Sequence, residues 1–421
     1  MNEQAIFVKC ARRLIPFMMA AYLVNYLDRV NVGFAALTMN ADLGLSPAVF
    51  GLGAGMFFIG YCLFQVPANV FLERVGARRW LAAILATWGV ISASNAFVHD
   101  AVSFYVLRFL LGVAEAGFFP GVLLYLTYWF PHSYRGRFTS LFMTAIPLSF
   151  IVGGPVSGLL LEMNGTLGLA GWQWLFMVEG IPACVLAVVA LKVLPDGPAD
   201  AAWLTPEEKE TIAQRLAAEE PVLHRAFWPA LLDPRVAALG LVYIGFGISA
   251  NGIRIWLPQI VQQMGFSNLA TVFIVAAPFA ASMGVMILWG RSSDVRGERV
   301  WHIALPFLLA AGGLIATIFS GSATVSLIAL AVAVIGILAA EGPFFSFPSS
   351  FLGAKAAAGG IALVSAIGSL GGFFGPSIVG ALREATGNYN AGMAALAAGL
   401  IVSALIVIAV GRALRNGTGG R

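Results

Sequence analysis

The sequence predicts an all-α integral membrane protein with twelve transmembrane helices in two pseudo-symmetric six-helix halves. Three observations carry this prediction. Of the 421 residues, 59% are hydrophobic and only 10% are charged, which lies outside the usual composition of soluble proteins. Apolar runs that are long enough to cross about 30 Å of hydrocarbon as helices recur along the whole chain. One long polar segment separates the first six runs from the last six.

The predicted spans follow one another with short connections. They cover residues 14–37, 47–71, 80–98, 103–129, 138–161, 173–194, 236–262, 269–289, 302–319, 325–351, 357–382 and 390–413. In the polar segment, Thr205 and Pro206 have the order of an N-cap and a first-turn proline, which predicts a short surface helix. We therefore expect an N-terminal bundle at 1–194, a cytoplasmic linker at 195–235 and a C-terminal bundle at 236–421.

The distribution of basic residues predicts the orientation in the membrane. With the N-terminus in the cytoplasm, nearly all Lys and Arg residues fall on the cytoplasmic side. The exceptions are Arg29, Arg108 and Arg254 within spans, and Arg383 outside. Because these basic residues are dispersed in short loops, they do not indicate a nucleic-acid partner. We expect a monomeric, multi-pass protein of a bacterial inner membrane, surrounded by lipid, with both termini in the cytoplasm.

The two halves carry similar motifs at corresponding places. An acid and several bases around a glycine turn follow the second span, at 73–79, and the eighth span, at 293–299. Glycine and proline recur in the fifth span, at 153–158, and in the eleventh, at 371–380. Ordinary tight packing explains any one of these glycines. Their matched occurrence favours a repeat in which glycine permits close helix approach and proline a bend.

Charged residues inside the predicted spans mark the candidate functional site. Asp28 and Arg29 lie in the first span, where each charge costs between about 2.5 and 17 kcal/mol. On a helix, Tyr22, Tyr26 and Arg29 share one face, and Asn25 and Asp28 lie beside it. An ion pair that only holds helices together is the alternative interpretation.

The fourth span carries a second acid and base. Arg108 and Glu115 are seven residues apart with Gly112 between them, so they share a face across two helical turns. An anion that enters such a cleft competes with the acids for the guanidinium groups, so anion binding and protonation are expected to be coupled. A static Arg108–Glu115 pair is the alternative.

Other polar residues of the spans are candidates for lining the same site. Tyr61 and Gln65, four residues apart, could bond substrate hydroxyls or each other. Arg254 could bind a second carboxylate, as in a diacid, or extend to the membrane surface. Glu341 could titrate or pair with Arg254. The remaining candidates are Asn251, and Ser346, Ser365 and Ser369, which could instead bond their own helix backbones.

No motif predicts an enzyme, a cofactor or a metal site. The sequence has no pattern typical of a catalytic triad, a zinc site or a phosphate-binding glycine loop. Cys10, Cys62 and Cys184 lack metal-ligand spacing and are expected to be free thiols. Histidines at loops and span ends, including His302, are expected to be solvated.

Several of these motifs together resemble the major facilitator superfamily over the whole chain. The loop at 73–79 is similar to the signature loop of that family, although it has glutamate where aspartate is more usual. Residues 108–121 resemble its arginine-and-glycine motif, and residues 153–158 its glycine-proline motif. Residues 25–31, with the charged residues of the fourth span, resemble the anion:cation symporter branch. That branch includes bacterial sugar-acid, tartrate and aromatic-acid transporters.

The resemblance implies proton-driven symport of a small organic anion into the cytoplasm by alternating access. By resemblance, Asp28 and Glu115 are the protonatable carboxyls, and Arg108 is the partner of these acids. Their protonation would free Arg29 to bind the substrate carboxylate. The implied substrate class comprises sugar acids, hydroxy-dicarboxylates and aromatic carboxylates.

Two departures from the family pattern keep the substrate open. Ser365 and Ser369 stand where tartrate-type members usually carry asparagine, and Glu341 stands where glutamine is common. These changes alter the polar lining of the C-terminal half. A proton-coupled drug or metabolite antiporter, which would favour cationic or neutral apolar ligands, is the alternative transporter. A membrane sensor that binds an anion without carrying it is a further alternative.

Overall fold

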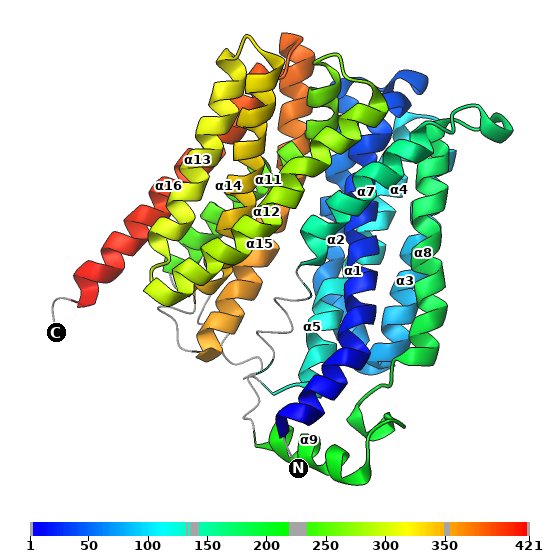
Figure 1. Ribbon diagram of the computed structural model, residues 1–421, viewed down its shortest axis with the longest axis vertical. Coiled ribbons are helices and arrows are strands. Elements are labelled where there is room, and N and C mark those ends of the chain that lie inside the picture. The colour runs from blue at the N-terminus through cyan, green and yellow to red at the C-terminus, as the bar shows by residue number, and fades with distance from the viewer. Residues whose placement is uncertain are drawn as a thin grey trace.

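The computed structural model describes most of the chain. The described residues are 3–131, 134, 142, 144–218, 234–348 and 354–418. Within these ranges the regular structure is entirely helical. The helices stand in two groups side by side, which we call the N-terminal group and the C-terminal group (Figure 1).

Long helices account for both groups. The N-terminal group contains α1 (Glu3–Asp42), α2 (Pro47–Val75), α3 (Ala77–Ser94), α4 (Ala101–Glu115), α5 (Phe118–Trp129), α7 (Ala145–Leu161) and α8 (Gly171–Val193). The C-terminal group contains α11 (Pro234–Gln262), α12 (Asn268–Arg296), α13 (Val300–Phe319), α14 (Ala323–Ser346), α15 (Ala354–Thr386) and α16 (Asn390–Thr418). Each predicted span overlaps one of these helices, except that α4 and α5 together form the fourth span.

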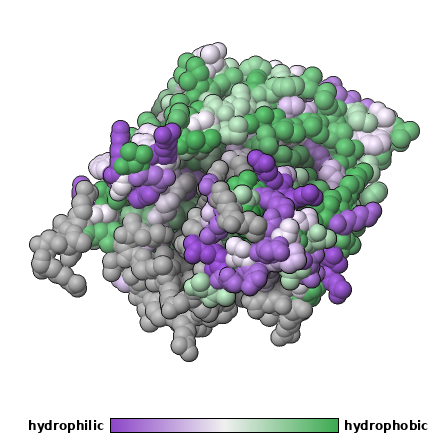
Figure 2. All heavy atoms as spheres, turned by 60° about the horizontal axis from the view of Figure 1, so that its bottom comes forward, coloured by the Kyte–Doolittle hydropathy of each residue, from purple (hydrophilic) through white to green (hydrophobic). Residues whose placement is uncertain are grey.

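The helices have the length and composition that a bilayer requires. Among the described residues, nine segments are long and apolar enough to cross a membrane, and α7 is a shorter apolar helix. The helices α1 and α15, of 40 and 33 residues, complete the bundle. Figure 2 shows hydrophobic atoms over the flank and hydrophilic atoms gathered at the end that Figure 1 places near α9 (Pro206–Ala217). The predicted all-α membrane fold is therefore confirmed.

The surface helix α9 begins where the Thr205 pattern predicts. The Thr205 hydroxyl accepts a hydrogen bond from the Glu208 N–H at 3.3 Å, and the Glu208 carboxylate accepts one from the Thr205 N–H at 2.9 Å. Glu208 also pairs with Lys9 of α1 at 2.7 Å. This reciprocal cap and ion pair attach α9 to the start of the first span.

Glycines in corresponding helices allow close contact, as the repeated motif predicts. A Cβ on Gly154 of α7 would lie 3.0 Å from the Val272 carbonyl oxygen of α12. A Cβ on Gly375 of α15 would overlap the Ile248 carbonyl oxygen of α11. The backbones of these helices therefore touch where a side chain would separate them.

The two groups meet at the end opposite to α9. The Glu384 carboxylate at the end of α15 accepts hydrogen bonds from the Ser46 hydroxyl at 2.6 Å and the Ala48 N–H at 2.8 Å, at the start of α2. Nearby, the Gln262 amide of α11 donates to the Leu37 carbonyl oxygen of α1 at 3.1 Å. These contacts close the bundle at that end.

The expectation of a solvated His302 is wrong. Its side chain is only 5% exposed, because the chain folds back between α12 and α13. The imidazole lies 2.8 Å from the Glu298 carboxylate and 3.1 Å from the Ser292 hydroxyl. A histidine near a span end is therefore part of the packed loop.

We predict that Gly375→Ala lowers the stability of the protein in detergent. The added methyl group must push α15 away from α11, and overpacking of this kind costs about 1–3 kcal/mol. The matched control is Gly312→Ala in α13, where an added Cβ meets nothing within 4 Å. The apparent unfolding temperature should fall for Gly375→Ala only, and equal values for the two variants would contradict the packing argument.

Candidate functional site

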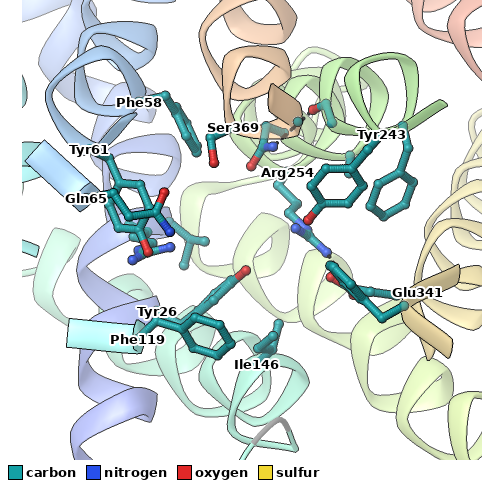
Figure 3. A pocket seen from close by; sticks show the side chains of 18 of the residues that line it. Tyr26, Phe58, Tyr61, Gln65, Phe119, Ile146, Tyr243, Arg254, Glu341 and Ser369 are labelled. Carbon is teal, nitrogen blue, oxygen red and sulfur yellow. Dashed lines mark hydrogen bonds and ion pairs between the residues drawn. The ribbon is translucent and has the colours of Figure 1, made fainter. Parts of the chain in front are cut away.

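A cavity of about 340 Å³ lies between the two groups of helices. Its wall is formed by α1, α2, α5 and α7 of the N-terminal group and by α11, α14 and α15 of the C-terminal group. Figure 3 shows Tyr61 and Gln65 on one side of the cavity and Arg254 and Glu341 on the other. A ligand in this cavity would contact both groups at once.

Arg29 lies in the cavity wall and is paired with a buried acid. Its Nε donates to Glu115 Oε2 at 2.8 Å, and the Asn25 amide donates to the same oxygen at 2.8 Å. Glu115 is fully buried and does not line the cavity. One terminal nitrogen of Arg29, Nη2, is buried without a hydrogen-bond partner among the described residues. Arg29 therefore retains hydrogen-bonding capacity for an anion.

Aromatic rings surround the Arg29 guanidinium. Its central carbon lies 4.7 Å from the centre of the Tyr61 ring, 5.4 Å from that of Tyr26 and 5.3 Å from that of Phe57. At these distances the ring faces attract the cation. The rings thus hold the guanidinium in place while part of it faces the cavity.

Asp28, the neighbour of Arg29 in sequence, belongs to a different cluster. Its carboxylate accepts hydrogen bonds from the Trp88 indole at 2.9 Å and the Ser92 hydroxyl at 2.7 Å, both on α3. The residue is fully buried and does not line the cavity. Adjacent residues on a helix point about 100° apart, so Asp28 faces α3 while Arg29 faces the cavity.

Arg108 lies behind the cavity without a hydrogen-bond partner among the described residues. It is fully buried, and its three guanidinium nitrogens make no hydrogen bond to any described residue. Asp28 and Glu115 are both within electrostatic range, and the Phe57 ring centre lies 5.2 Å away. The static Arg108–Glu115 pair considered from the sequence is therefore not formed within the described residues.

A second arginine and acid lie on the C-terminal side of the cavity. Arg254 Nη2 is 3.6 Å from Glu341 Oε2, and the two side chains are 8% and 15% exposed. Both residues line the cavity (Figure 3). Arg254 therefore does not extend to the membrane surface, which was the alternative considered from the sequence.

The remaining candidates divide between the cavity and its surroundings. Tyr26, Tyr61, Gln65, Asn251 and Ser369 line the cavity. The Asn251 amide donates to the Gly247 carbonyl oxygen of its own helix at 3.0 Å. Asn25 supports Glu115 from outside the cavity wall, and Ser346 bonds the Gly342 carbonyl oxygen at 3.1 Å. The side chain of Ser365 lies outside the described residues.

Beyond Tyr22, Tyr26 and Tyr61, sequence reasoning missed the aromatic lining of the site. Phe58, Phe119, Tyr243, Phe246 and Phe345 all line the cavity. In a sequence, an aromatic residue that faces a cavity looks the same as one that faces lipid or the core. A charge at membrane depth is a much stronger signal of a site, because such a group is costly there.

We predict that Asn25→Ala destabilises the protein more than Asn251→Ala. Asn25 donates to a charged acceptor, Glu115, and such a bond contributes about 1.5–3 kcal/mol. The Asn251 bond to its own helix backbone is neutral and contributes about 0.5–1.5 kcal/mol. Apparent unfolding temperatures in one detergent test this order. An equal or reversed order would show that Asn25 does not support the buried carboxylate.

Comparisons with known proteins agree with this architecture. A family model described as "Major Facilitator Superfamily" matches residues 18–376. A protein of Agrobacterium vitis named "Putative tartrate transporter" is 47% identical over 413 residues, which cover 97% of this chain and 92% of that protein. A "Quinolone resistance transporter" of Acinetobacter baumannii is 41% identical over 386 residues, which cover 90% and 89% of the two chains.

Solved structures share the fold. A bacterial homolog of the human lysosomal transporter Spinster, in an inward-facing and occupied conformation, has a TM-score of 0.77 to this protein. The two are 16% identical, and the match covers 95% of this chain and 96% of that chain. The chain belongs to the Major Facilitator Superfamily and is a multi-pass membrane transporter, not an enzyme.

Proposed function

We propose that this protein is a proton-coupled symporter that imports a small organic anion across the bacterial inner membrane by alternating access. The observation that carries the proposal is the pair of Arg29, in the cavity wall, and Glu115, buried behind it at 2.8 Å. A substrate carboxylate and Glu115 compete for the same guanidinium. The name of the Agrobacterium vitis relative supports an organic acid as substrate.

Protonation of Glu115 is the first step. A neutral Glu115 no longer forms an ion pair with Arg29, so the guanidinium becomes available to a carboxylate as a planar, two-pronged donor. Tyr26, Tyr61 and Gln65 line the cavity near this position and offer hydroxyl and amide groups to substrate hydroxyls. These features favour sugar acids, hydroxy-dicarboxylates and aromatic carboxylates as the substrate class.

Asp28 and Arg108 extend the coupling behind the cavity. Arg108 lies within electrostatic range of both acids but is bonded to neither. When Glu115 becomes neutral, Arg108 interacts mainly with Asp28, so the charge states of the two acids are linked. An unneutralised charge is costly in the membrane interior. The conformational change is therefore favoured only when the charges of the site are balanced, with or without substrate.

The contacts between the two groups of helices provide the alternating step. In the proposed orientation, with both termini in the cytoplasm, the end closed by Glu384 and Ser46 faces outside. Import requires these contacts to break while the cytoplasmic ends of the helices approach each other. The two groups then rock about the substrate that both of them hold.

We predict that Arg29→Gln weakens substrate binding by about 10- to 100-fold, because hydrogen bonds to a charged group contribute about 1.5–3 kcal/mol. Binding is measured by thermal shift of the solubilised protein against a panel of organic acids. The control is Arg383→Gln, because Arg383 lies over Tyr389 outside the cavity. Unchanged affinity in Arg29→Gln would disprove the role of Arg29.

We predict that Asp28→Asn retains substrate binding but abolishes accumulation driven by a pH gradient. Asp28 does not line the cavity, so its neutralisation spares the binding contacts while removing a group that gains and loses a proton. Uptake into liposomes is compared with and without an inward proton gradient. The wild type should respond to the gradient and the variant should not. Wild-type accumulation by Asp28→Asn would defeat the coupling role.

A proton-coupled drug antiporter is the second candidate function. Two observations favour it: the aromatic lining of the cavity and the likeness to a "Quinolone resistance transporter". Against it stand two arginines in the same wall, which repel cationic drugs. Tight binding of a cationic dye, together with indifference to every carboxylate in the panel, would favour the antiporter.

A further inference from the structure

The two sides of the cavity each carry one arginine paired with one glutamate. On the N-terminal side Arg29 pairs with Glu115, and on the C-terminal side Arg254 lies beside Glu341. Glu115 is hidden behind the wall, whereas Glu341 is part of it. Among the described residues that line the cavity, Glu341 is the only acid. Figure 3 shows it on the same side of the cavity as Arg254.

The C-terminal pair is looser than the N-terminal pair. The Arg29–Glu115 contact is a hydrogen bond of 2.8 Å, but Arg254 Nη2 and Glu341 Oε2 are 3.6 Å apart. This distance exceeds the usual limit of about 3.2 Å for such a bond. Both atoms are buried and have no hydrogen-bond partner within the described part of the chain. A second carboxylate at Arg254 would supply the missing acceptor.

Few other ionisable groups lie near Arg254 and Glu341 among the described residues that line the cavity. Tyr243 of α11 lies on the same side of the cavity as Arg254 and Glu341, and Tyr22 and Tyr26 of α1 line it from the N-terminal group. The neighbouring helices α12 and α13 place no titratable side chain among the described lining residues. The charge balance on the C-terminal side is therefore set by Arg254 and Glu341 together.

We infer that Glu341 is a second proton-coupling carboxyl, used when the substrate carries two carboxylates. The inference rests on the proposed symport. One carboxylate of the substrate binds Arg29, and the other replaces Glu341 as the partner of Arg254. Glu341 then takes one proton from solvent, which it releases when the substrate leaves. A monocarboxylate occupies Arg29 alone, so Glu341 stays ionised and paired. Transport of one dicarboxylate therefore moves one more proton than it would if Glu341 were absent.

The test uses L-tartrate as the dicarboxylate and glycerate as the monocarboxylate, both fully ionised. In proteoliposomes, a pH dye measures proton uptake and a radiolabel measures substrate uptake in the same experiment. Valinomycin sets the membrane potential. For Glu341→Gln, the protons taken up per tartrate fall by one, and an inside-negative potential slows tartrate uptake more than in the wild type. The protons taken up per glycerate stay unchanged.

Two further variants separate this role from a structural one. Glu179→Gln is the matched control, because Glu179 is a buried acid bonded to Ser157 at 2.7 Å and does not line the cavity. Glu179→Gln leaves the number of protons taken up per tartrate and per glycerate unchanged. If Glu341→Gln fails to fold, the double variant Glu341→Gln with Arg254→Gln leaves no unpaired charge there. It loses tartrate uptake, because the second carboxylate has no partner, but it keeps the wild-type proton count per glycerate. Tartrate uptake by this variant with the wild-type proton count overturns the inference.

The outcomes distinguish this inference from the proposed function. If the wild type takes up neither acid in response to a pH gradient, the proposed symport is wrong and the inference falls with it. If it takes up glycerate with protons but not tartrate, the symport stands and the dicarboxylate role is overturned. An unchanged proton count per tartrate in Glu341→Gln also overturns the inference alone.

Discussion

The ion pair between Arg29 and Glu115 is the interaction on which the site depends. Two charges buried at membrane depth are tolerated because they neutralise each other, and removal of either partner leaves an uncompensated charge. Protonation of Glu115 therefore leaves the Arg29 charge uncompensated and favours binding of an anion there. When the anion leaves, ionisation of Glu115 is favoured again. The proposed coupling between proton and anion binding follows from this exchange of partners at Arg29.

Close helix packing places this pair. A Cβ on Gly112 of α4 would overlap the Phe57 carbonyl oxygen of α2, so the two helices touch at that point. The Phe57 ring is close to two cations, with its centre 5.3 Å from the Arg29 guanidinium and 5.2 Å from that of Arg108. At these distances the ring attracts each of the two arginines. One glycine in the sequence thus shapes the electrostatics of the cavity wall.

Much of the fold follows from the sequence because the bilayer sets the length of each span. The apolar runs predict where helices cross, but α1 extends from Glu3 to Asp42 beyond the predicted 14–37, since a helix continues past the hydrocarbon. The fourth predicted span, 103–129, is divided between α4 and α5 at Ala116 and Gly117. Hydropathy cannot reveal such a break, because apolar residues continue through both helices.

The sequence by itself determined which residues carry charge at membrane depth, because the cost of burying Asp28, Arg29 or Arg254 makes each of them conspicuous. Tertiary structure decided which partners they have. Asp28 faces Trp88 on α3, while its neighbour Arg29 faces a cavity, and Arg254 meets Glu341 from another helix. Helical periodicity specifies the angle between two side chains, but which helix lies in that direction depends on how the whole bundle packs.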